Sequence, residues 1–455
     1  MEHITKNYDV IVIGAGLSGL HAAKILSQQG KNVLILEAKE RIGGRVWTIP
    51  INGNEHLDVG GQWVAKSHLK MHELLREYRL ETFPTYIREY SLISFHQAVK
   101  KYRAIPPIPL RSLWALLRLM TTFERLAQKI ILLTPWETPQ SRELDNLTVK
   151  SWIHSKSENT LANKIFTAML ESLFCCDLDS TSMLQALIAI KSSGSLNFMI
   201  GNKNGAQEKR IKGGAQTVCN AIMKNISATI HFNSPVTHIH QHDDYVEVRS
   251  NETHYTAKKV IVSIPLPSAK EINFYPKLPS AKQALVDAMF MASVIKYQFV
   301  YEKPFWRSSG NRNGMSLSLD GFVSGTFDNS LPNSRTGIMV AFVHANHAKE
   351  LWKQPQAQRI EIVQDELSVL FGTDALNPIA VNEHTYMNDE WIKGCYAGVF
   401  PPQILSQYGS ELRTPFHHIY WAGTETSTYF MGYMEGAVLS GERAANEVLN
   451  SMENS

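Results

Sequence analysis

The feature that most constrains the fold is a glycine-rich turn near the N-terminus. Residues 14–19 read GAGLSG and directly follow the β-branched apolar run 8–13. A helical pattern comes next and ends at Gly30, and residues 32–36 form a second apolar run. Strand, turn, helix and strand in this order predict a β-α-β unit whose two strands are parallel and buried.

Each glycine of the turn has its own task in a dinucleotide-binding unit. Gly14 permits the tight turn, Gly16 lets the backbone approach a pyrophosphate, and Gly19 allows the helix to pack closely on the strand. The helix N-terminus presents unpaired N–H groups to the phosphates. Glu37 ends the second strand, where a carboxylate accepts hydrogen bonds from an adenosine ribose. The predicted dinucleotide site therefore includes Gly14, Gly16, Ser18, Gly19, Glu37 and Lys39.

Strand signals of the same kind recur in the middle and at the end of the chain. Alternating residues at 234–257 suggest a β-meander, and residues 259–264 predict a further buried strand. Near the C-terminus, residues 418–422 predict a strand that a Gly-rich turn connects to a helix over about 434–449. The cofactor domain is therefore expected to be discontinuous.

Composition excludes several classes of protein. With 44% hydrophobic and 19% charged residues, the chain can bury a substantial core. A net charge of +3 gives no reason to expect nucleic acid, because phosphate binding needs a concentrated basic face. The four cysteines form no C-x-x-C pair, so no metal site is predicted, and their scarcity fits a reducing compartment. We see neither a signal peptide nor an apolar run of roughly 20 residues, and expect a cytoplasmic protein.

Two further glycine motifs and the C-terminal block carry a family resemblance. Residues 41–45 read RIGGR, residues 58–63 read DVGGQW, and residues 421–426 and 432–437 read WAGTET and GYMEGA. Together with Glu37, these motifs resemble the flavin-containing amine oxidase family over nearly the whole chain, and most closely the monoamine oxidases and bacterial putrescine or tyramine oxidases. The resemblance implies FAD, with cofactor contacts that add Gly44, Arg45, Gly60, Gly61, Gln62, Trp63, Val236, Gly423, Thr424, Glu425 and Met434.

The implied fold is α/β, with a Rossmann-like FAD-binding domain of the glutathione-reductase type interleaved with an α+β substrate domain. We expect the FAD-binding domain at residues 1–84, 211–286 and 388–455. The substrate domain is expected at residues 85–210 and 287–387, which have longer helical patterns and more aromatic residues.

The resemblance also assigns roles on the reacting face. Gly394-Cys395-Tyr396 resembles the site where monoamine oxidases bond a cysteine sulfur to the flavin, so a covalent link through Cys395 is expected. Tyr396 and Tyr433 match the two rings that sandwich the substrate amine, where cation–π attraction holds an ammonium and desolvation favours the neutral amine. Lys296 matches the lysine near the reactive flavin nitrogen, where a cation assists reoxidation by dioxygen.

The substrate pocket is the part of the site where the chain departs from the family. Ile200 and Gln207 match pocket positions, but Gly325 stands where the family's gating loop has an aromatic residue, and no acid is there to bind a distant second ammonium. Tyr386 replaces a tryptophan nine positions before Cys395, and Trp391 lies closer, so the rings that line the flavin could have exchanged places. The reaction is therefore predicted more narrowly than the substrate.

The predicted function is FAD-dependent oxidation of a primary amine to an aldehyde and ammonia, with dioxygen reduced to hydrogen peroxide. One alternative keeps the fold and makes the chain an L-amino acid oxidase or a desaturase. The amino acid oxidase needs an arginine for the carboxylate, and residues 62–66 contain none. A second alternative is a flavin-bearing interaction protein, although added domains, heptads and a basic tail are missing. The expected partners are a small amine and dioxygen, and a homodimer is compatible with the sequence.

Residues 111–133 form a basic, amphipathic segment. Such a segment could lie on a membrane surface. We favour a helix, or a pair of helices, that covers the substrate domain.

Overall fold

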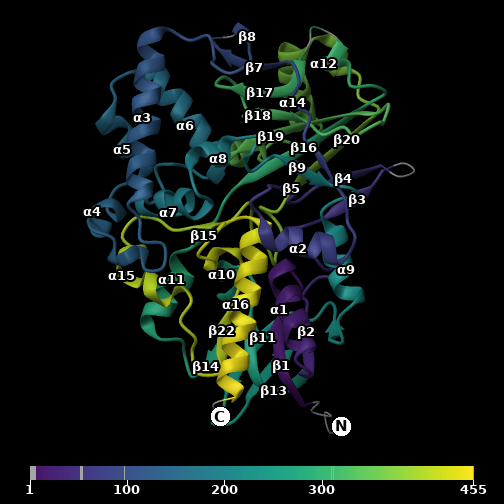
Figure 1. Ribbon diagram of the computed structural model, residues 1–455, viewed down its shortest axis with the longest axis vertical. Coiled ribbons are helices and arrows are strands. Elements are labelled where there is room, and N and C mark those ends of the chain that lie inside the picture. The colour runs from purple at the N-terminus through teal and green to yellow at the C-terminus, as the bar shows by residue number, and fades with distance from the viewer. Residues whose placement is uncertain (1–6, 52–54, 97, 309, 311, 454–455) are drawn as a thin grey trace.

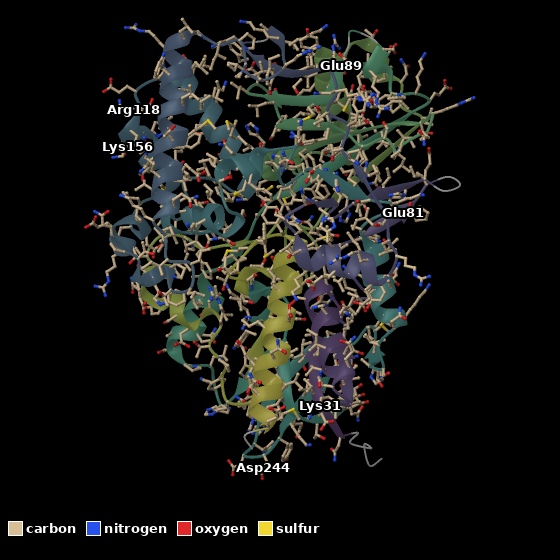
Figure 2. All side chains as sticks on the ribbon, viewed as in Figure 1. Lys31, Glu81, Glu89, Arg118, Lys156 and Asp244 are labelled. Atoms are coloured by element: carbon tan, nitrogen blue, oxygen red, sulfur yellow. The ribbon has the colours of Figure 1, made fainter. Side chains whose placement is uncertain are left out.

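The computed structural model describes residues 7–51, 55–96, 98–308, 310 and 312–453. Figure 1 shows an elongated molecule in which α1 (Leu17–Gln28) and α16 (Met434–Glu453) lie side by side at the end that holds both termini. Long helices from the first half of the chain and a second sheet occupy the other end (Figure 1). In Figure 2, charged side chains such as Lys31, Glu81 and Arg118 lie at the periphery.

The predicted β-α-β unit is confirmed and lies within a sheet that has eight strands in the described part of the chain. Strand β1 (Asn7–Ile13) pairs in parallel with β2 (Val33–Leu36), and Ile11 lies opposite Leu34. All four residues of β2 are buried, as expected when helices or loops cover both faces of a parallel sheet. The sheet order is β10-β2-β1-β13-β12-β11-β14, with β22 paired to β13; the added strands are β10 (Thr229–His231), β11 (Val236–Gln241), β12 (Val246–Ser250), β13 (Thr253–Val262), β14 (Asn273–Tyr275) and β22 (Ile419–Trp421).

The predicted meander is confirmed, but the predicted break before residue 259 is wrong. Strand β13 is continuous because its first half pairs antiparallel with β12 while its second half pairs in parallel with β1. The strand ends at Val262, two residues earlier than predicted. The Ser263 hydroxyl then donates to the carbonyl oxygens of Ile13 and Gly14 at 2.8 and 3.1 Å. This serine joins the ends of two parallel strands at the glycine-rich turn.

Helix α16 packs on α1, which brings the C-terminal motifs to the N-terminal turn. The contact is close because an ideal Cβ at Gly441 would lie 2.3 Å from the carbonyl oxygen of Ser18. The hydroxyls of Ser18 and Ser440 are 3.0 Å apart, and both lie near the Gly423 N–H. Segments about 400 residues apart in sequence therefore share one edge of the sheet.

Among the residues that the structure describes, the second sheet has seven strands in the order β20-β16-β19-β18-β17-β7-β8. Strand β16 (Val294–Tyr301) lies between β20 and β19 and is buried along its whole length. Helices α13 (Ala345–Leu351) and α14 (Gln356–Phe371) supply residues to the apolar core at this sheet. The other strands are β20 (Ala380–Thr385), β19 (Gly337–His344), β18 (Gly325–Asp328), β17 (Arg312–Ser318), β7 (Tyr90–Phe95) and β8 (Ala98–Tyr102).

The amphipathic segment folds as one helix, α3 (Leu110–Gln128), followed by a turn. Its buried face includes Leu116, Leu119 and Phe123, while Trp114 is 74% exposed. Helices α6 (Thr160–Phe174), α7 (Met183–Ser193) and α8 (Leu196–Ile200) complete this helical layer. Within the described ranges, the structure contains no helix with the length and apolar character needed to cross a bilayer.

Candidate active site

A cavity of about 880 Å³ is lined by residues from both sheets and from the helical layer. One end lies at the carboxyl end of β2, where Glu37 and Val236 form the wall, and the other end lies against Leu113 and Leu117 of α3. The turn after β1 lies beside Glu37 at the first end, and residues at the start of α16 also line the cavity. The carboxyl ends of parallel strands are where α/β sheets bind their ligands.

The glycine-rich turn gives the first end of the cavity its shape. Gly14 has φ +100°, and its N–H donates to the carbonyl oxygen of Leu36 at 2.8 Å. An ideal Cβ at Gly19 would lie 2.1 Å from the carbonyl oxygen of Gly14, so this residue sets the close helix–strand contact. An ideal Cβ at Gly16 meets nothing within 4 Å, and this backbone therefore borders open space in the cavity.

Glu37 lies beside this turn and is tied to two backbone groups. Its carboxylate accepts hydrogen bonds from the N–H of Ala15 at 2.6 Å and of Lys39 at 2.9 Å. Burial raises the pKa of Glu37, and these two hydrogen bonds oppose the rise. The Lys39 amine pairs with Asp389, whose other oxygen accepts from the N–H groups of residues 391 and 392. The ion pair thus connects this end of the cavity to the segment that carries Cys395.

Arg45 is held by a bidentate ion pair with Glu425. The guanidinium donates to the two carboxylate oxygens at 2.5 and 3.0 Å, and to the carbonyl oxygen of Tyr396 at 2.9 Å. The Gly398 N–H donates to the same carboxylate at 2.9 Å. Burial alone would raise the pKa of Glu425, but the paired guanidinium brings it below its ordinary value. Arg45 therefore keeps a fixed orientation on the cavity wall.

Lys296 is a buried amine near the start of β16, only 5% exposed. Its Nζ donates to the carbonyl oxygens of Asp58 at 2.5 Å and Gly60 at 3.1 Å, and to Gln62 Oε1 at 2.6 Å. Burial lowers the pKa of Lys296 to about 7, and the charge of Asp58 opposes this change. The amine is therefore able to change its protonation state near neutral pH.

Cys395 and Tyr396 follow β20 in a loop whose backbone approaches its neighbours closely. An ideal Cβ at Gly394 would lie 2.4 Å from the carbonyl oxygen of Ala292, which also accepts the Cys395 N–H at 2.9 Å. Burial raises the pKa of the Cys395 thiol to about 11 and that of Tyr396 far above its ordinary value. The Tyr396 ring meets the Phe342 ring edge-on, with centroids 6.3 Å apart.

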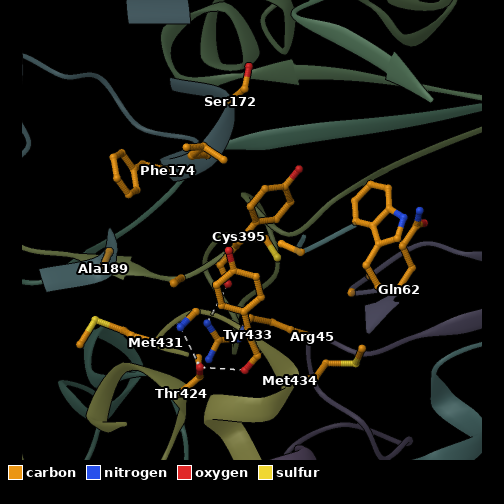
Figure 3. Close-up of a pocket in the computed structure, with 18 of the residues that line it drawn as sticks. Arg45, Gln62, Ser172, Phe174, Ala189, Cys395, Thr424, Met431, Tyr433 and Met434 are labelled. Atoms are coloured by element: carbon orange, nitrogen blue, oxygen red, sulfur yellow. Dashed lines mark hydrogen bonds between the residues drawn. The ribbon is translucent and has the colours of Figure 1, made fainter. Parts of the chain in front are cut away.

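Tyr433 reaches the same part of the cavity from the start of α16. Thr424 donates through its hydroxyl to the carbonyl oxygen of Tyr433 at 2.9 Å and accepts from the Gly432 N–H at 2.8 Å. The His68 ring packs edge-on against the Tyr433 ring at 5.5 Å between centroids. Burial raises the pKa of Tyr433 to about 12, so the phenol stays neutral. In Figure 3 its ring points into the pocket beside Cys395.

The part of the cavity beyond the two tyrosines is mostly apolar, with Met169, Phe174 and Phe327 on its wall. The Gln207 amide donates to the carbonyl oxygen of Met199 at 3.0 Å. At Gly325, an ideal Cβ would lie 2.9 Å from the carbonyl oxygen of Ser316. The glycine that replaces the family's aromatic gating residue therefore lies close to the neighbouring strand β17.

Two of the predicted site residues do not reach the cavity wall. Gly19 acts through helix packing, and Glu425 acts through Arg45. The others lie on the wall: Gly14, Gly16, Ser18, Glu37, Lys39, Gly44, Arg45, Gly60, Gly61, Gln62, Trp63, Ile200, Gln207, Val236, Lys296, Gly325, Cys395, Tyr396, Gly423, Thr424, Tyr433 and Met434.

Several wall residues were missed from the sequence. Ser263 follows a strand that is parallel to β1, and the rule that ligands bind at carboxyl strand ends could have found it. Phe174 and His344 carried no local signal, because their place depends on how distant elements pack.

Trp391 lies on the wall, whereas Tyr386 is 2% exposed with its hydroxyl 3.5 Å from the carbonyl oxygen of Gly44.

The chain is similar to flavin-containing amine oxidases in both sequence and structure. Residues 17–449 match the model of the flavin containing amine oxidoreductases. The chain is 32% identical to amine oxidase [flavin-containing] B of Sus scrofa over 98% of its length and 86% of that protein, and 33% identical to amine oxidase [flavin-containing] A of Equus caballus over 98% and 85%. Putrescine oxidase bound to putrescine superposes with a TM-score of 0.94 at 28% identity, over 98% of this chain and 100% of that one.

Cyclohexylamine oxidase from Brevibacterium oxydans superposes equally well, with a TM-score of 0.94 at 27% identity over 98% of this chain. The chain thus belongs to the flavin-containing amine oxidoreductase family and is an FAD-dependent amine oxidase. The predicted α/β fold and the predicted cofactor are confirmed.

The residues at the first end of the cavity fit FAD. The open backbone at Gly16 leaves room that a side chain would fill, and within the described structure no side chain caps the first turn of α1. Unpaired N–H groups at a helix N-terminus suit a pyrophosphate. Glu37 suits a ribose, and the buried Trp63 Nε1 has no hydrogen-bond partner among the described residues.

Proposed function

We propose that this enzyme oxidises a primary monoamine with an apolar body. The amine, dioxygen and water become an aldehyde, ammonia and hydrogen peroxide. Bound FAD supplies the acceptance of a hydride equivalent and the transfer of two electrons to dioxygen. The observation that carries the proposal is that Lys296, Cys395, Tyr396 and Tyr433 line one continuous cavity with the dinucleotide turn.

The two tyrosines orient and desolvate the amine. Both phenols are neutral because burial raises the pKa of Tyr396 and of Tyr433. Neutral ring faces attract an ammonium by roughly 0.5–2 kcal/mol. An apolar cage also lowers the pKa of a bound amine, which favours the deprotonated form that is oxidised.

The charged groups of the cavity favour a monoamine. Among the described residues, the cavity-lining carboxylates are Glu37, which is bonded to the turn after β1, and Glu271, which pairs with Lys393 at 2.6 Å. Neither belongs to the apolar end, so a second ammonium lacks a counter-charge there. The lining arginines are Arg45, held by Glu425, and Arg103, which is largely exposed; neither is a buried, free guanidinium for an amino acid carboxylate.

Cys395 is proposed as the covalent attachment point of FAD. Cys395 lines the same cavity as the cofactor end and the two tyrosines, and it is only 7% exposed. The neighbouring Arg45 cation lowers the thiol pKa and partly opposes the effect of burial. Lys296 is proposed to assist dioxygen reduction, since a nearby cation stabilises the developing negative charge.

The organisation expected from the sequence belongs to the same proposal. The FAD-binding domain would comprise residues 1–84, 211–286 and 388–455, and the insertions would form the substrate domain. The small amine and dioxygen would be the reactants, and the cytoplasm the location.

Two measurements test the proposed function. The purified holoenzyme is assayed for hydrogen peroxide with arylalkyl monoamines, aliphatic monoamines and putrescine; we expect the highest kcat/KM for an apolar monoamine, and a preference for the diamine would contradict the proposal. Acid precipitation should leave the flavin in the pellet for the native enzyme and release it for Cys395→Ser. Flavin released from both proteins would exclude the thioether.

A further inference from the structure

The amide of Gln62 faces Lys296 in a fixed orientation. Gln62 is 2% exposed, and its Oε1 accepts a hydrogen bond from the Lys296 amine at 2.6 Å. Its Nε2 donates to Asn329 Oδ1 at 2.9 Å, and Asn329 Nδ2 donates more weakly to Gln62 Oε1 at 3.4 Å. A side-chain amide has nearly the same shape when its oxygen and nitrogen are exchanged. The charged lysine, which only donates, and the partner of Nε2 together therefore determine which of the two atoms faces the lysine.

Asn329 is held in place by its backbone, so its side chain can orient the Gln62 amide. It is 1% exposed, and its backbone N–H donates to the carbonyl oxygen of Ile338 at 2.7 Å. Its own carbonyl oxygen accepts from the Arg210 guanidinium at 2.6 Å. Because both backbone groups are bonded, the position of Asn329 does not depend on its side chain.

We propose that Asn329 is a positioning residue for Lys296. By holding Gln62 Nε2, it keeps the amide oxygen directed at the lysine and completes a set of three acceptors around the amine. Three acceptors match the three N–H groups of an ammonium, whereas a neutral amine has only two N–H groups to donate. The amide pair therefore favours the charged lysine.

The other charged or titratable groups that face Lys296 act on its charge in opposite directions or are neutral at pH 7. From β4 (His56–Asp58), Asp58 favours the charged amine, while Arg210 from β9 (Lys209–Ile211) opposes it. Burial holds the pKa of His384 on β20 at about 4 and that of Cys395 at about 11, so both are neutral at pH 7. The opposed charges of Asp58 and Arg210, 3.9 Å apart, offset each other in part.

The consequence for catalysis rests on the proposed role of Lys296 in dioxygen reduction. A lysine that titrates near pH 7 is sensitive to a single hydrogen bond, because one pKa unit corresponds to about 1.4 kcal/mol. If Asn329 is replaced by an apolar residue, the Gln62 amide can turn its NH₂ group toward the ammonium and disfavour the charge. The reaction with dioxygen would then lose its cation at neutral pH.

The test compares Asn329→Leu and Asn329→Asp in the flavin-loaded enzyme. The visible flavin spectrum is titrated with pH under anaerobic conditions, and flavin reduction and reoxidation are timed separately by stopped flow. We expect Asn329→Leu to move the spectral midpoint down by about one pH unit and to slow reoxidation about fivefold at pH 7, because the charged fraction of the lysine falls from about one half to about one tenth. Flavin reduction should change less than about twofold, and Asn329→Asp should move the midpoint up.

Asn313→Leu is the matched control, because Asn313 is also buried (3% exposed) and its amide bonds Ser91 and the Met315 N–H, away from Lys296. If both leucine variants give the same midpoint and reoxidation rate, the inference is wrong. Lys296→Met distinguishes the proposed role of the lysine from the positioning role of Asn329. If this variant leaves the titration and reoxidation unchanged, the proposed role of the lysine in dioxygen reduction is wrong. If it abolishes the titration while Asn329→Leu does not shift it, only the positioning role fails. Asn329→Ser replaces the leucine variant if that one does not fold.

Discussion

The cofactor end and the substrate end of the cavity are built in different ways. At the cofactor end, the backbone at Gly14 and Gly16 forms the wall and the close helix–strand packing at Gly19 supports it; these residues lie within six positions of one another. At the substrate end, side chains such as Phe174 and Phe327 come from elements about 150 residues apart. The cofactor end tolerates little change where it is tightly packed, because a new Cβ at Gly19 meets fixed backbone atoms, whereas the side chains of the substrate end can be altered without moving the fold.

The largest expected effect is at Gly19. Gly19→Val places side-chain atoms within about 2 Å of the Gly14 carbonyl oxygen, so α1 must move away from β1. We expect a loss of more than about 3 kcal/mol in the free energy of unfolding and a protein that no longer retains flavin. Denaturant titration and the flavin-to-protein absorbance ratio measure both. Gly30→Ala is the control, because Gly30 has φ +71° but nothing lies within 4 Å of an added Cβ. This substitution should lower the free energy of unfolding by about 1 kcal/mol, and the variant should retain its flavin.

A smaller loss is expected when the Arg45–Glu425 pair is broken. Glu425→Gln leaves a guanidinium that is 20% exposed without its charged partner, and we expect about 2 kcal/mol of destabilisation. The folded-state pKa of Glu425 is lowered, so the stabilising effect is present above the unfolded pKa of about 4.3 and is lost as the pH falls through the folded pKa. The difference between native and variant unfolding free energies should therefore shrink on acidification.

Glu81→Gln is the matched control for this pair. Glu81 and Lys212 are 72% and 74% exposed, and solvent screens their attraction. Its cost should stay below about 0.5 kcal/mol at pH 7. If the two substitutions lower the free energy of unfolding equally, the buried pair of Arg45 and Glu425 does not stabilise the cofactor end more than an exposed ion pair would.

The same contrast explains what the sequence could predict. The β-α-β unit follows from local apolar runs, and the glycine turn follows from spacing, so these features need no knowledge of distant contacts. The continuity of β13 was missed because it depends on two different partner strands. The burial of Lys296 and its bond to Gln62 were outside the reach of local patterns, since they join residues 234 positions apart. Only the family resemblance pointed to that lysine.

At the substrate end, a new charge should change selectivity more than stability. Ser324 lies on the cavity wall and its N–H donates to the carbonyl oxygen of Phe342 at 2.8 Å, a bond that a substitution retains. Ser324→Asp provides the counter-charge that the apolar end lacks. We expect the ratio of kcat/KM for putrescine over that for a monoamine of equal length to rise about tenfold, which corresponds to about 1.4 kcal/mol. Ser324→Asn controls for size, and an equal rise in both variants would rule out the charge as the cause.

The smallest effect is expected from Phe174→Leu. The phenylalanine lies on the wall at the C-terminal end of α6 and is partly exposed, so its truncation removes little buried area and should cost less than about 1.5 kcal/mol of stability. KM for a long apolar amine should rise about threefold while kcat stays constant, because the lost contact is the same in the ground state and the transition state. Flavin content should equal that of the native enzyme. A loss of flavin from this variant, measured beside Gly30→Ala, would mean that the two ends of the cavity are coupled and that the contrast between a backbone wall and a side-chain wall does not hold.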